Sequence, residues 1–172
     1  MRINTDELTD RQLLELHCTV MDALRKRGVI RSSNNPVADY TETLVARALN
    51  ATLAVGSQAG FDAVGQDGTR YQIKGRRLTA ANKSTQLSAL RNLASGPFDQ
   101  LAAVVFNSNL HVEYAALIPL DVVQKLGRYR AHTNSHTLYF RRSLFEEPGV
   151  TNVTDLIIAA TTITHKPQSI SI

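Results

Sequence analysis

The sequence has a single cysteine, Cys18, which excludes an intrachain disulfide and a four-cysteine zinc site. No apolar run approaches the roughly 18 residues that a membrane-spanning helix needs. The N-terminal stretch MRINTDELTDRQ contains no apolar segment of the kind found in signal peptides. We therefore expect a cytoplasmic protein that has no membrane partner.

Acidic residues are missing from two long stretches of the chain, although its net charge is only +4. One stretch runs between Asp67 and Asp99, and the other between Asp121 and Glu146. Both contain basic residues: Arg70, Lys74, Arg76, Arg77, Lys83 and Arg91 in the first, and Lys125, Arg128, Arg130, Arg141 and Arg142 in the second. Such clusters favour a polyanionic partner. Two solvated basic faces without a ligand are the simpler interpretation.

Familiar catalytic motifs are also missing from the sequence. It shows no Ser-His-Asp arrangement, no phosphate-binding glycine loop and no dinucleotide-binding fingerprint. His132 and His136 have the spacing of a helical zinc pair, but AHTNSHT is a poor helix sequence and no third His or Cys stands nearby. We therefore place both histidines in a polar loop.

The length of 172 residues and the 43% hydrophobic content predict one globular domain with a substantial core. Apolar periodicity and turn residues divide the chain into predicted helices at 10–27, 37–50, 86–93 and 119–126, and predicted strands at 52–55, 61–65, 69–74, 101–107 and 112–118. This order predicts an α/β fold with a central mixed sheet flanked by helices.

Within the single domain, 1–172, we distinguish an N-terminal helical part (1–30), a core (37–118) and a basic C-terminal extension (119–172). A capping box at Thr9 and Gln12 predicts the start of the first helix. We expect residues 127–149 to be irregular except for a strand at 137–140. Thr154 precedes either a last helix or a strand.

The stretch FDAVGQDGTRYQIKGRR, residues 61–77, has the pattern of a β-hairpin with polar residues at core-like positions. A two-residue loop would place Asp62 on the opposite face from Gln72 and Lys74. A three-residue loop ending in Gly68 pairs Asp62 with Gln72 and sets both on the same face as Lys74. We choose the three-residue loop because it gathers the three polar side chains at one edge.

Those side chains suit a hard divalent cation such as Mg²⁺, which prefers oxygen ligands. Asp62 would supply a carboxylate and Gln72 an amide carbonyl oxygen. The backbone carbonyl of Ile73 could supply a third oxygen. Lys74 would then place its ammonium group near an attacking water or a scissile phosphate, where it stabilises the charge that develops.

The pattern Asp62…Gln72-Ile73-Lys74 on a hairpin resembles the PD-(D/E)xK nuclease superfamily, whose best-known members are restriction endonucleases. The resemblance covers roughly residues 39–93 and continues through the two later strands. It implies a restriction endonuclease-like fold with an αβββαβ core, preceded here by an additional N-terminal helix. It also implies Mg²⁺- or Mn²⁺-dependent hydrolysis of DNA. The helix before the hairpin often offers a glutamate to the same site in this family, and Glu42 matches it.

The sequence departs from the family pattern in two positions. Phe61 and Ala63 flank Asp62, so the proline of the motif name is missing. Gln72 replaces an acidic residue, which removes one negative charge and should weaken metal binding. Some family members, including restriction enzymes that act on modified DNA, tolerate glutamine there, so it is compatible with activity. A surface hairpin with incidental polar residues is the simpler interpretation.

The basic stretches supply candidate DNA contacts. The candidates are Arg76, Arg77, Lys83, Arg91, Arg128, Arg130, Asn134, Arg141 and Arg142. We expect residues 125–142 to lie on the same side of the domain as Lys74 and to form a basic wall beside the site.

The sequence thus predicts a metal-dependent endonuclease that acts on DNA, for which restriction, repair and phage defence are all open settings. A DNA-binding protein that keeps the nuclease fold without catalysis is the alternative, and Gln72 favours it. A structural protein without a nucleic-acid partner is a third interpretation. Cutting two strands at one place usually needs two sites, so a homodimer is compatible with the first interpretation. The sequence leaves open the DNA site, the pathway and the oligomeric state.

Overall fold

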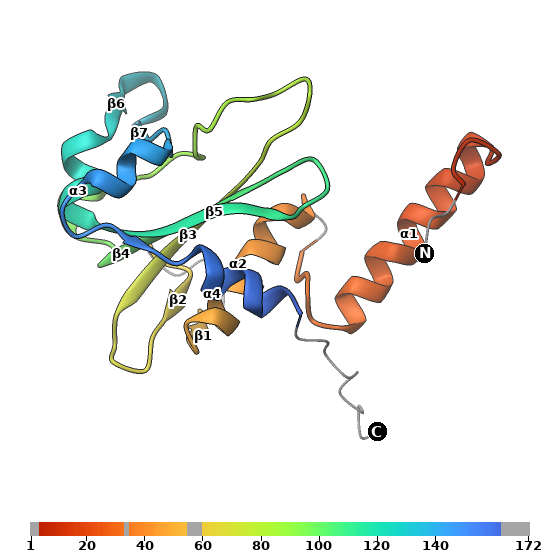
Figure 1. The fold of residues 1–172 in the computed structure, drawn as a ribbon, viewed down its shortest axis with the longest axis horizontal. Helices are drawn as coiled ribbons and strands as arrows, with labels where there is room; N and C mark the ends of the chain where they lie inside the picture. The colour runs from red at the N-terminus through yellow and green to blue at the C-terminus, as the bar shows by residue number, and fades with distance from the viewer. Residues whose placement is uncertain (1–3, 33–34, 55–59, 163–172) are drawn as a thin grey trace.

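The computed structural model of the chain describes residues 4–32, 35–54 and 60–162. The described residues form four α-helices: α1 (Asp10–Lys26), α2 (Pro36–Ala48), α3 (Leu120–Leu126) and α4 (Thr154–Thr161) (Figure 1). They also form the strands β1 (Thr52–Leu53), β2 (Ala63–Val64), β3 (Arg70–Arg77), β4 (Gln100–Phe106), β5 (Val112–Pro119), β6 (Arg128–Arg130), β7 (Ser135–Thr137) and β8 (Thr151–Asn152).

Six of these strands form one mixed sheet in the order β1-β2-β3-β4-β5-β8. β3 and β4 run parallel, and every other neighbouring pair is antiparallel. β6 and β7 form a separate two-stranded hairpin. The predicted α/β class with a mixed sheet flanked by helices is confirmed. None of the described helices is long and apolar enough to cross a membrane.

Two hydrophobic layers cover the two faces of the sheet. On β4 alternate residues point to opposite faces, as strand geometry requires. Leu101, Ala103 and Val105 face one layer, and Ala102, Val104 and Phe106 face the other. α2 and α4 contact each other and cover the second face. α3, the crossover 78–99 and residues of 138–144 cover the first face.

A close approach between α2 and β3 depends on a glycine. A Cβ atom at Gly75 would lie 2.0 Å from Oγ1 of Thr41, which is less than any real contact. Thr41 is fully buried, and its hydroxyl donates to the carbonyl of Val37 within α2 at 2.6 Å. Glycine at position 75 therefore lets α2 pack directly on the strand that carries the candidate site.

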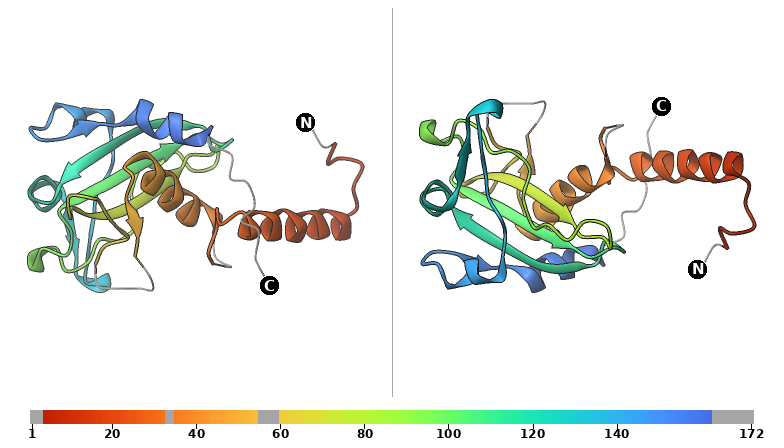
Figure 2. Two further views of the ribbon diagram at one scale, coloured as in Figure 1. Left: turned by 90° about the horizontal axis from the view of Figure 1, so that it is seen from below. Right: turned by 90° about the horizontal axis from the view of Figure 1, so that it is seen from above.

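α1 extends away from the sheet along the long axis of the molecule (Figures 1 and 2). Its predicted capping box is present: Thr9 accepts a hydrogen bond from the backbone of Gln12, whose side chain accepts from the backbone of Thr9. Met21 is the one α1 residue that is buried. α1 is thus a well-capped helix that contributes little to the sheet's core.

The helix predicted at 86–93 is wrong. Leu87, Leu90 and Leu93 are buried at a three-residue spacing that imitates a helical stripe, but the backbone pairs with a distant segment. The N–H of Leu87 donates to the carbonyl of Leu138, and that of Leu90 to the carbonyl of His136, both at 2.9 Å. Within the described residues the only helical turn of the β3–β4 connection is a 3₁₀ turn, Leu93–Ser95.

The extension after α3 also differs from the prediction. Residues expected to be irregular form the β6–β7 hairpin, whose turn uses Asn134 at φ +43°. The strand predicted at 137–140 is replaced by β7 and by an isolated bridge between Tyr139 and Gln86. The last segment is a helix, with Val153 rather than Thr154 at its N-cap. The predicted strand 52–55 includes Val55, which lies outside the described residues, as do residues 163–172 of the predicted extension.

Candidate active site on the β2–β3 hairpin

A three-residue loop, 66–68, joins the two hairpin strands as predicted. The N–H of Gly65 donates to the carbonyl of Thr69 at 2.8 Å and closes the loop. Gly68, the last loop residue, has φ +85°, a left-handed conformation that glycine adopts without strain. The loop length therefore matches a bulged hairpin rather than a two-residue turn.

This loop sets the register of the hairpin. Ala63 pairs with Tyr71, so that Asp62 lies beside Gln72. Oδ2 of Asp62 accepts hydrogen bonds from the side-chain nitrogen of Gln72 and from the backbone N–H of Ile73, the latter at 2.6 Å. The predicted pairing of Asp62 with Gln72 is confirmed.

Lys74 shares a strand face with Gln72. Ile73, between them, packs into the core layer under α2, so its two neighbours point to the opposite face. Within the described residues Lys74 has no ion-pair partner. Its ammonium group is thus available to a ligand from outside the described chain.

Glu42 approaches this site from α2. Its side chain is 18% exposed and forms an ion pair with Arg31. Burial raises the pKa of Glu42, the negative charge of Asp62 raises it further, and Arg31 partly offsets both effects. The two carboxylates are therefore close enough to repel each other, as expected for two groups at one site.

Arg31 was not predicted at the site, because it stands in a polar connector with no local motif. Its backbone N–H and that of Ser32 both donate to Oδ2 of Asp39 at 2.7 Å. Burial alone would raise the pKa of Asp39, but these hydrogen bonds outweigh it and hold the pKa below its usual value. Asp39 thus fixes the connector and with it the guanidinium that pairs with Glu42.

The donor atoms at this site fit a hard divalent cation. Asp62 and Glu42 supply two carboxylates, and both bonds to Asp62 engage Oδ2 rather than Oδ1. The N–H and C=O of one strand residue point to the same side, so the carbonyl of Ile73 lies on the side of β3 that faces Asp62. A cation there would relieve the repulsion that raises the pKa of Glu42.

Gln72 presents its amide nitrogen, not its oxygen, to Asp62. It would need a half-turn of the amide group to offer oxygen to a cation. Among the described residues, no three His, Cys, Asp or Glu side chains gather at a metal-binding point. The cation would therefore depend on two carboxylates supplemented by neutral oxygens.

The arginines that follow the site strand have structural partners. Arg76, on the face of Lys74, donates to the carbonyl of Ser84 at 2.7 Å and to the side chain of Asn82. Arg77 lies on the opposite face by strand alternation and donates to the carbonyl of Ser108 at 2.6 Å. The structure therefore does not bring Arg77 together with the predicted site.

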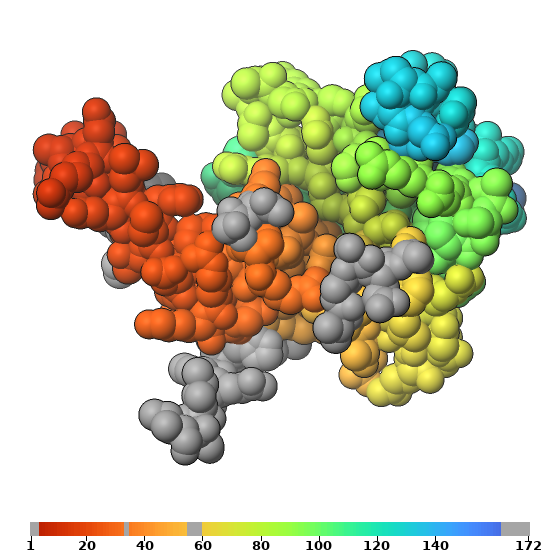
Figure 3. All heavy atoms as spheres, turned by 180° about the vertical axis from the view of Figure 1, so that it is seen from behind, coloured from red at the N-terminus to blue at the C-terminus, as the bar shows by residue number. Residues whose placement is uncertain are grey.

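The β6–β7 hairpin lies over the same face of the sheet as Gln72 and Lys74. Bridges between Gln86 and Tyr139 and between Leu90 and His136 attach residues 135–139 to the crossover, which packs on that face. Figure 3 shows the crossover (green) next to the hairpin segment (cyan to blue). Arg128, Arg130 and Asn134 are exposed there, as are Lys83 and Arg91 on the crossover.

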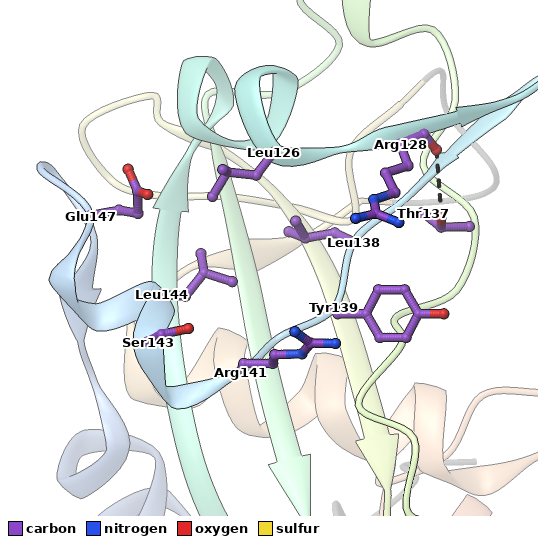
Figure 4. Close-up of a pocket in the computed structure, with 9 residues that line it drawn as sticks. All are labelled: Leu126, Arg128, Thr137, Leu138, Tyr139, Arg141, Ser143, Leu144 and Glu147. Atoms are coloured by element: carbon purple, nitrogen blue, oxygen red, sulfur yellow. Dashed lines mark hydrogen bonds between the residues drawn. The ribbon is translucent and has the colours of Figure 1, made fainter.

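A hollow of about 410 Å³ lies beside this hairpin (Figure 4). Arg128 and Arg141 line it together with Tyr139 and Glu147. The guanidinium of Arg141 lies 5.6 Å from the centre of the Tyr139 ring. That of Arg142 lies over the ring of Tyr114 instead, at 4.8 Å. None of the candidate-site residues on the β2–β3 hairpin lines this hollow, so the hollow is separate from the candidate active site.

No protein-family model matches this chain, and no curated protein matches it in sequence. The site's distinguishing features are the two neighbouring carboxylates of Asp62 and Glu42 and a glutamine bonded to the first of them. On the same strand face Lys74 has no ion pair among the described residues.

Proposed function

We propose that this protein is a metal-dependent endonuclease that hydrolyses phosphodiester bonds of DNA. The observation that carries the proposal is the placement of Asp62 against Gln72 and Ile73, with Glu42 within electrostatic range and Lys74 two residues further along β3. This arrangement supports a distant relationship to the PD-(D/E)xK nucleases and a restriction endonuclease-like fold. Two features depart from that family: the connection between β3 and β4, all of which the structure describes, has no α-helix, and glutamine stands at position 72.

Each residue has a distinct role in the proposal. Asp62, Glu42, the amide oxygen of Gln72 and the carbonyl of Ile73 would hold a Mg²⁺ or Mn²⁺ ion. Bound there, the ion would supply positive charge that stabilises a developing oxyanion. Lys74 would hold the scissile phosphate or orient the water through its ammonium group. For the cation to bind, Glu42 would exchange its ion pair with Arg31 for the metal.

The exposed basic residues of the β6–β7 hairpin and the crossover would hold the DNA backbone beside the site. Arg128, Arg130, Lys83 and Arg91 suit this role because they are exposed on the face to which Lys74 points. Phosphate contacts of this kind bind duplexes of any sequence and weaken as salt rises. The DNA partner is part of the proposal.

A plasmid-nicking assay with Mg²⁺ or Mn²⁺ tests the proposal. Unmodified and methylated plasmids are both used, because glutamine at position 72 suits a nuclease of modified DNA. We expect nicking by the natural chain, at least a hundredfold less with Asp62→Asn or Lys74→Ala, and unchanged nicking with Asp67→Asn. Asp62→Asn removes the charge at the site but keeps an acceptor for the backbone N–H of Ile73. Asp67→Asn makes the same change in the exposed turn of the hairpin, so it controls for damage to the hairpin. Nicking that survives Asp62→Asn would contradict the assignment.

A non-catalytic DNA-binding protein is the second candidate. The bond from the amide nitrogen of Gln72 to Asp62 favours it, because that bond holds the carboxylate without any cation. Salt-sensitive duplex binding without nicking of either plasmid would support this candidate and contradict the first. The absence of salt-sensitive binding would contradict both.

A further inference from the structure

The N-terminal helix carries an apolar face that the rest of the described chain leaves uncovered. Leu13, Leu14 and Val20 are 37%, 66% and 46% exposed. No described helix or strand contacts α1 extensively. The helix stands away from the sheet in all views (Figures 1, 2 and 3). An isolated helix of this length is only marginally stable in water, so a partner along this face would stabilise it.

Leu13 and Val20 belong to one continuous stripe, whereas Leu14 lies about 100° away from Leu13 around the helix. At about 100° per residue, Leu13, Val20 and Leu24 fall within an arc of about 40°, with Leu16 and His17 on either side. The stripe begins near the free end of α1 and ends at Leu24, three residues beyond the buried Met21. Its length of two to three helical turns suits the side of another helix rather than a small ligand.

The charges at the two ends of α1 are of opposite sign. Residues 4–15, at the free end, contain four acidic residues and one basic residue: Asp6, Glu7, Asp10 and Glu15, with Arg11. Arg25, Lys26 and Arg27 follow one another at the root, where Arg25 forms an ion pair with Asp22 at 2.8 Å and leaves a net positive charge. Two α1 helices side by side in the same direction would place like charges together. Two helices in opposite directions would place each acidic end against the partner's basic root.

We propose that this face binds a second copy of the same chain, with the two α1 helices packed antiparallel around a two-fold axis. In a pairing centred between residues 18 and 19, Leu13 faces Leu24 of the partner subunit, and His17 faces Val20 of the partner subunit. One symmetric contact then covers the apolar stripe and brings each acidic free end near the partner's Lys26 and the partner's Arg27. An acidic free end also makes an anionic membrane surface an unfavourable alternative.

The mass of the protein in solution, measured by light scattering over a range of concentrations, tests the pairing. We expect a shift from 18.9 kDa to twice that value as concentration rises. Val20→Lys should raise the dissociation constant at least tenfold, because it places a charge in the stripe. Thr19→Lys adds the same charge outside the stripe, four residues after Glu15, and should leave the dimer unchanged. Circular dichroism of both variants verifies that the domain stays folded.

Disulfide trapping tests the direction of the helices in a Cys18→Ser background. Leu13→Cys chains mixed with Leu24→Cys chains should form mixed disulfides, since the two positions meet across the pair. Leu13→Cys alone should not form them, because the two copies lie about 16 Å apart along the axis, well beyond disulfide reach.

Three outcomes overturn this inference. They are a monomer at every concentration, a dimer that Val20→Lys leaves intact, and efficient self-trapping of Leu13→Cys. Cosedimentation of the monomer with phosphatidylcholine vesicles, lost in Val20→Lys, would assign the stripe to a lipid surface and also contradict the dimer. None of these measurements depends on nuclease activity, so the dimer and the proposed function can fail independently.

Discussion

At the scale of single residues, each carboxylate of the candidate site is held by a partner within the chain. Asp62 accepts hydrogen bonds from Gln72 and Ile73, whereas Glu42 is held by Arg31. Both carboxylates are thus partnered without a cation. A ligand at the site must compete with these internal bonds, and substitutions of the partners should reveal that competition.

The glutamine provides one such test. Gln72→Glu removes the amide hydrogen bond to Asp62 and adds a second negative charge beside it. We expect a lower melting temperature without divalent cations and its recovery with Mg²⁺ or Mn²⁺. The added charge should also lower the metal concentration for half-maximal nicking roughly tenfold, equivalent to about 1.4 kcal/mol of tighter binding. Gln72→Ala loses the bond without adding charge and serves as the control. Equal responses to Mg²⁺ in both variants would contradict a cation at this site.

Asp39 gives a pH-dependent prediction. Its pKa is lower in the folded chain than the unfolded value of about 3.9, so it contributes stability above that pH and loses the contribution as pH falls through the folded pKa. Asp39→Asn should therefore reduce the free energy of unfolding by about 1–2 kcal/mol at pH 7. The difference should shrink below about pH 4. Urea denaturation between pH 7 and pH 3 measures both values, and a constant difference would show that the charge is unimportant.

At the scale of elements, the position of α2 decides whether Glu42 reaches the hairpin. The helix is held against β3 where Thr41 lies directly over Gly75. Ile73, two residues earlier on the same strand, shares a core layer with Leu44 and Val45 of α2. Any displacement of α2 at Gly75 must therefore also move Glu42 relative to Asp62.

Gly75→Ala should displace α2, since its new methyl group would lie 2.0 Å from the Thr41 hydroxyl. We expect the free energy of unfolding to fall by about 1–3 kcal/mol, the usual cost of overpacking. Thr41→Ala removes the clashing atoms, so the double variant should lose less stability than the sum of the single variants. Strict additivity in urea denaturation would show that the two residues do not meet.

At the scale of the whole molecule, the described chain presents two surfaces with different chemistry. One is the face on which the crossover and the β6–β7 hairpin lie, rich in exposed arginine and lysine. The other is the apolar stripe of α1, which extends away from the sheet (Figure 1). The proposed partner of the basic surface is DNA, and the proposed partner of the stripe is a second copy of the chain. The two assignments use different residues and can be tested in the same protein.

Salt-dependent binding to a short DNA duplex tests the basic surface. Arg130→Ala should weaken binding and reduce the slope of log affinity against log salt by about 0.9 if it contacts one phosphate. Arg11→Ala also removes one exposed arginine, but from the free end of α1, and should leave the slope unchanged. Fluorescence anisotropy at several salt concentrations measures both. Equal slopes for Arg130→Ala and the natural chain would remove the hairpin from the proposed interface.

The sequence by itself determined the features that local geometry controls. The capping box of α1, the three-residue loop and the pairing of Asp62 with Gln72 follow from patterns within a few residues of each other. The buried strands β4 and β5 were predictable because apolar runs of this length bounded by turn residues usually form buried strands.

Only the tertiary structure decided the features that depend on distant partners. The stretch 86–93 has leucines at a helical spacing, yet its backbone bonds to residues 136 and 138, which lie 46 to 51 residues further along the chain. Local sequence patterns likewise could not predict that Arg31 pairs with Glu42 or that the apolar stripe of α1 stays exposed. The physical reason is that a backbone group or charge takes whichever partner the packed chain brings near, and that partner need not be close in sequence.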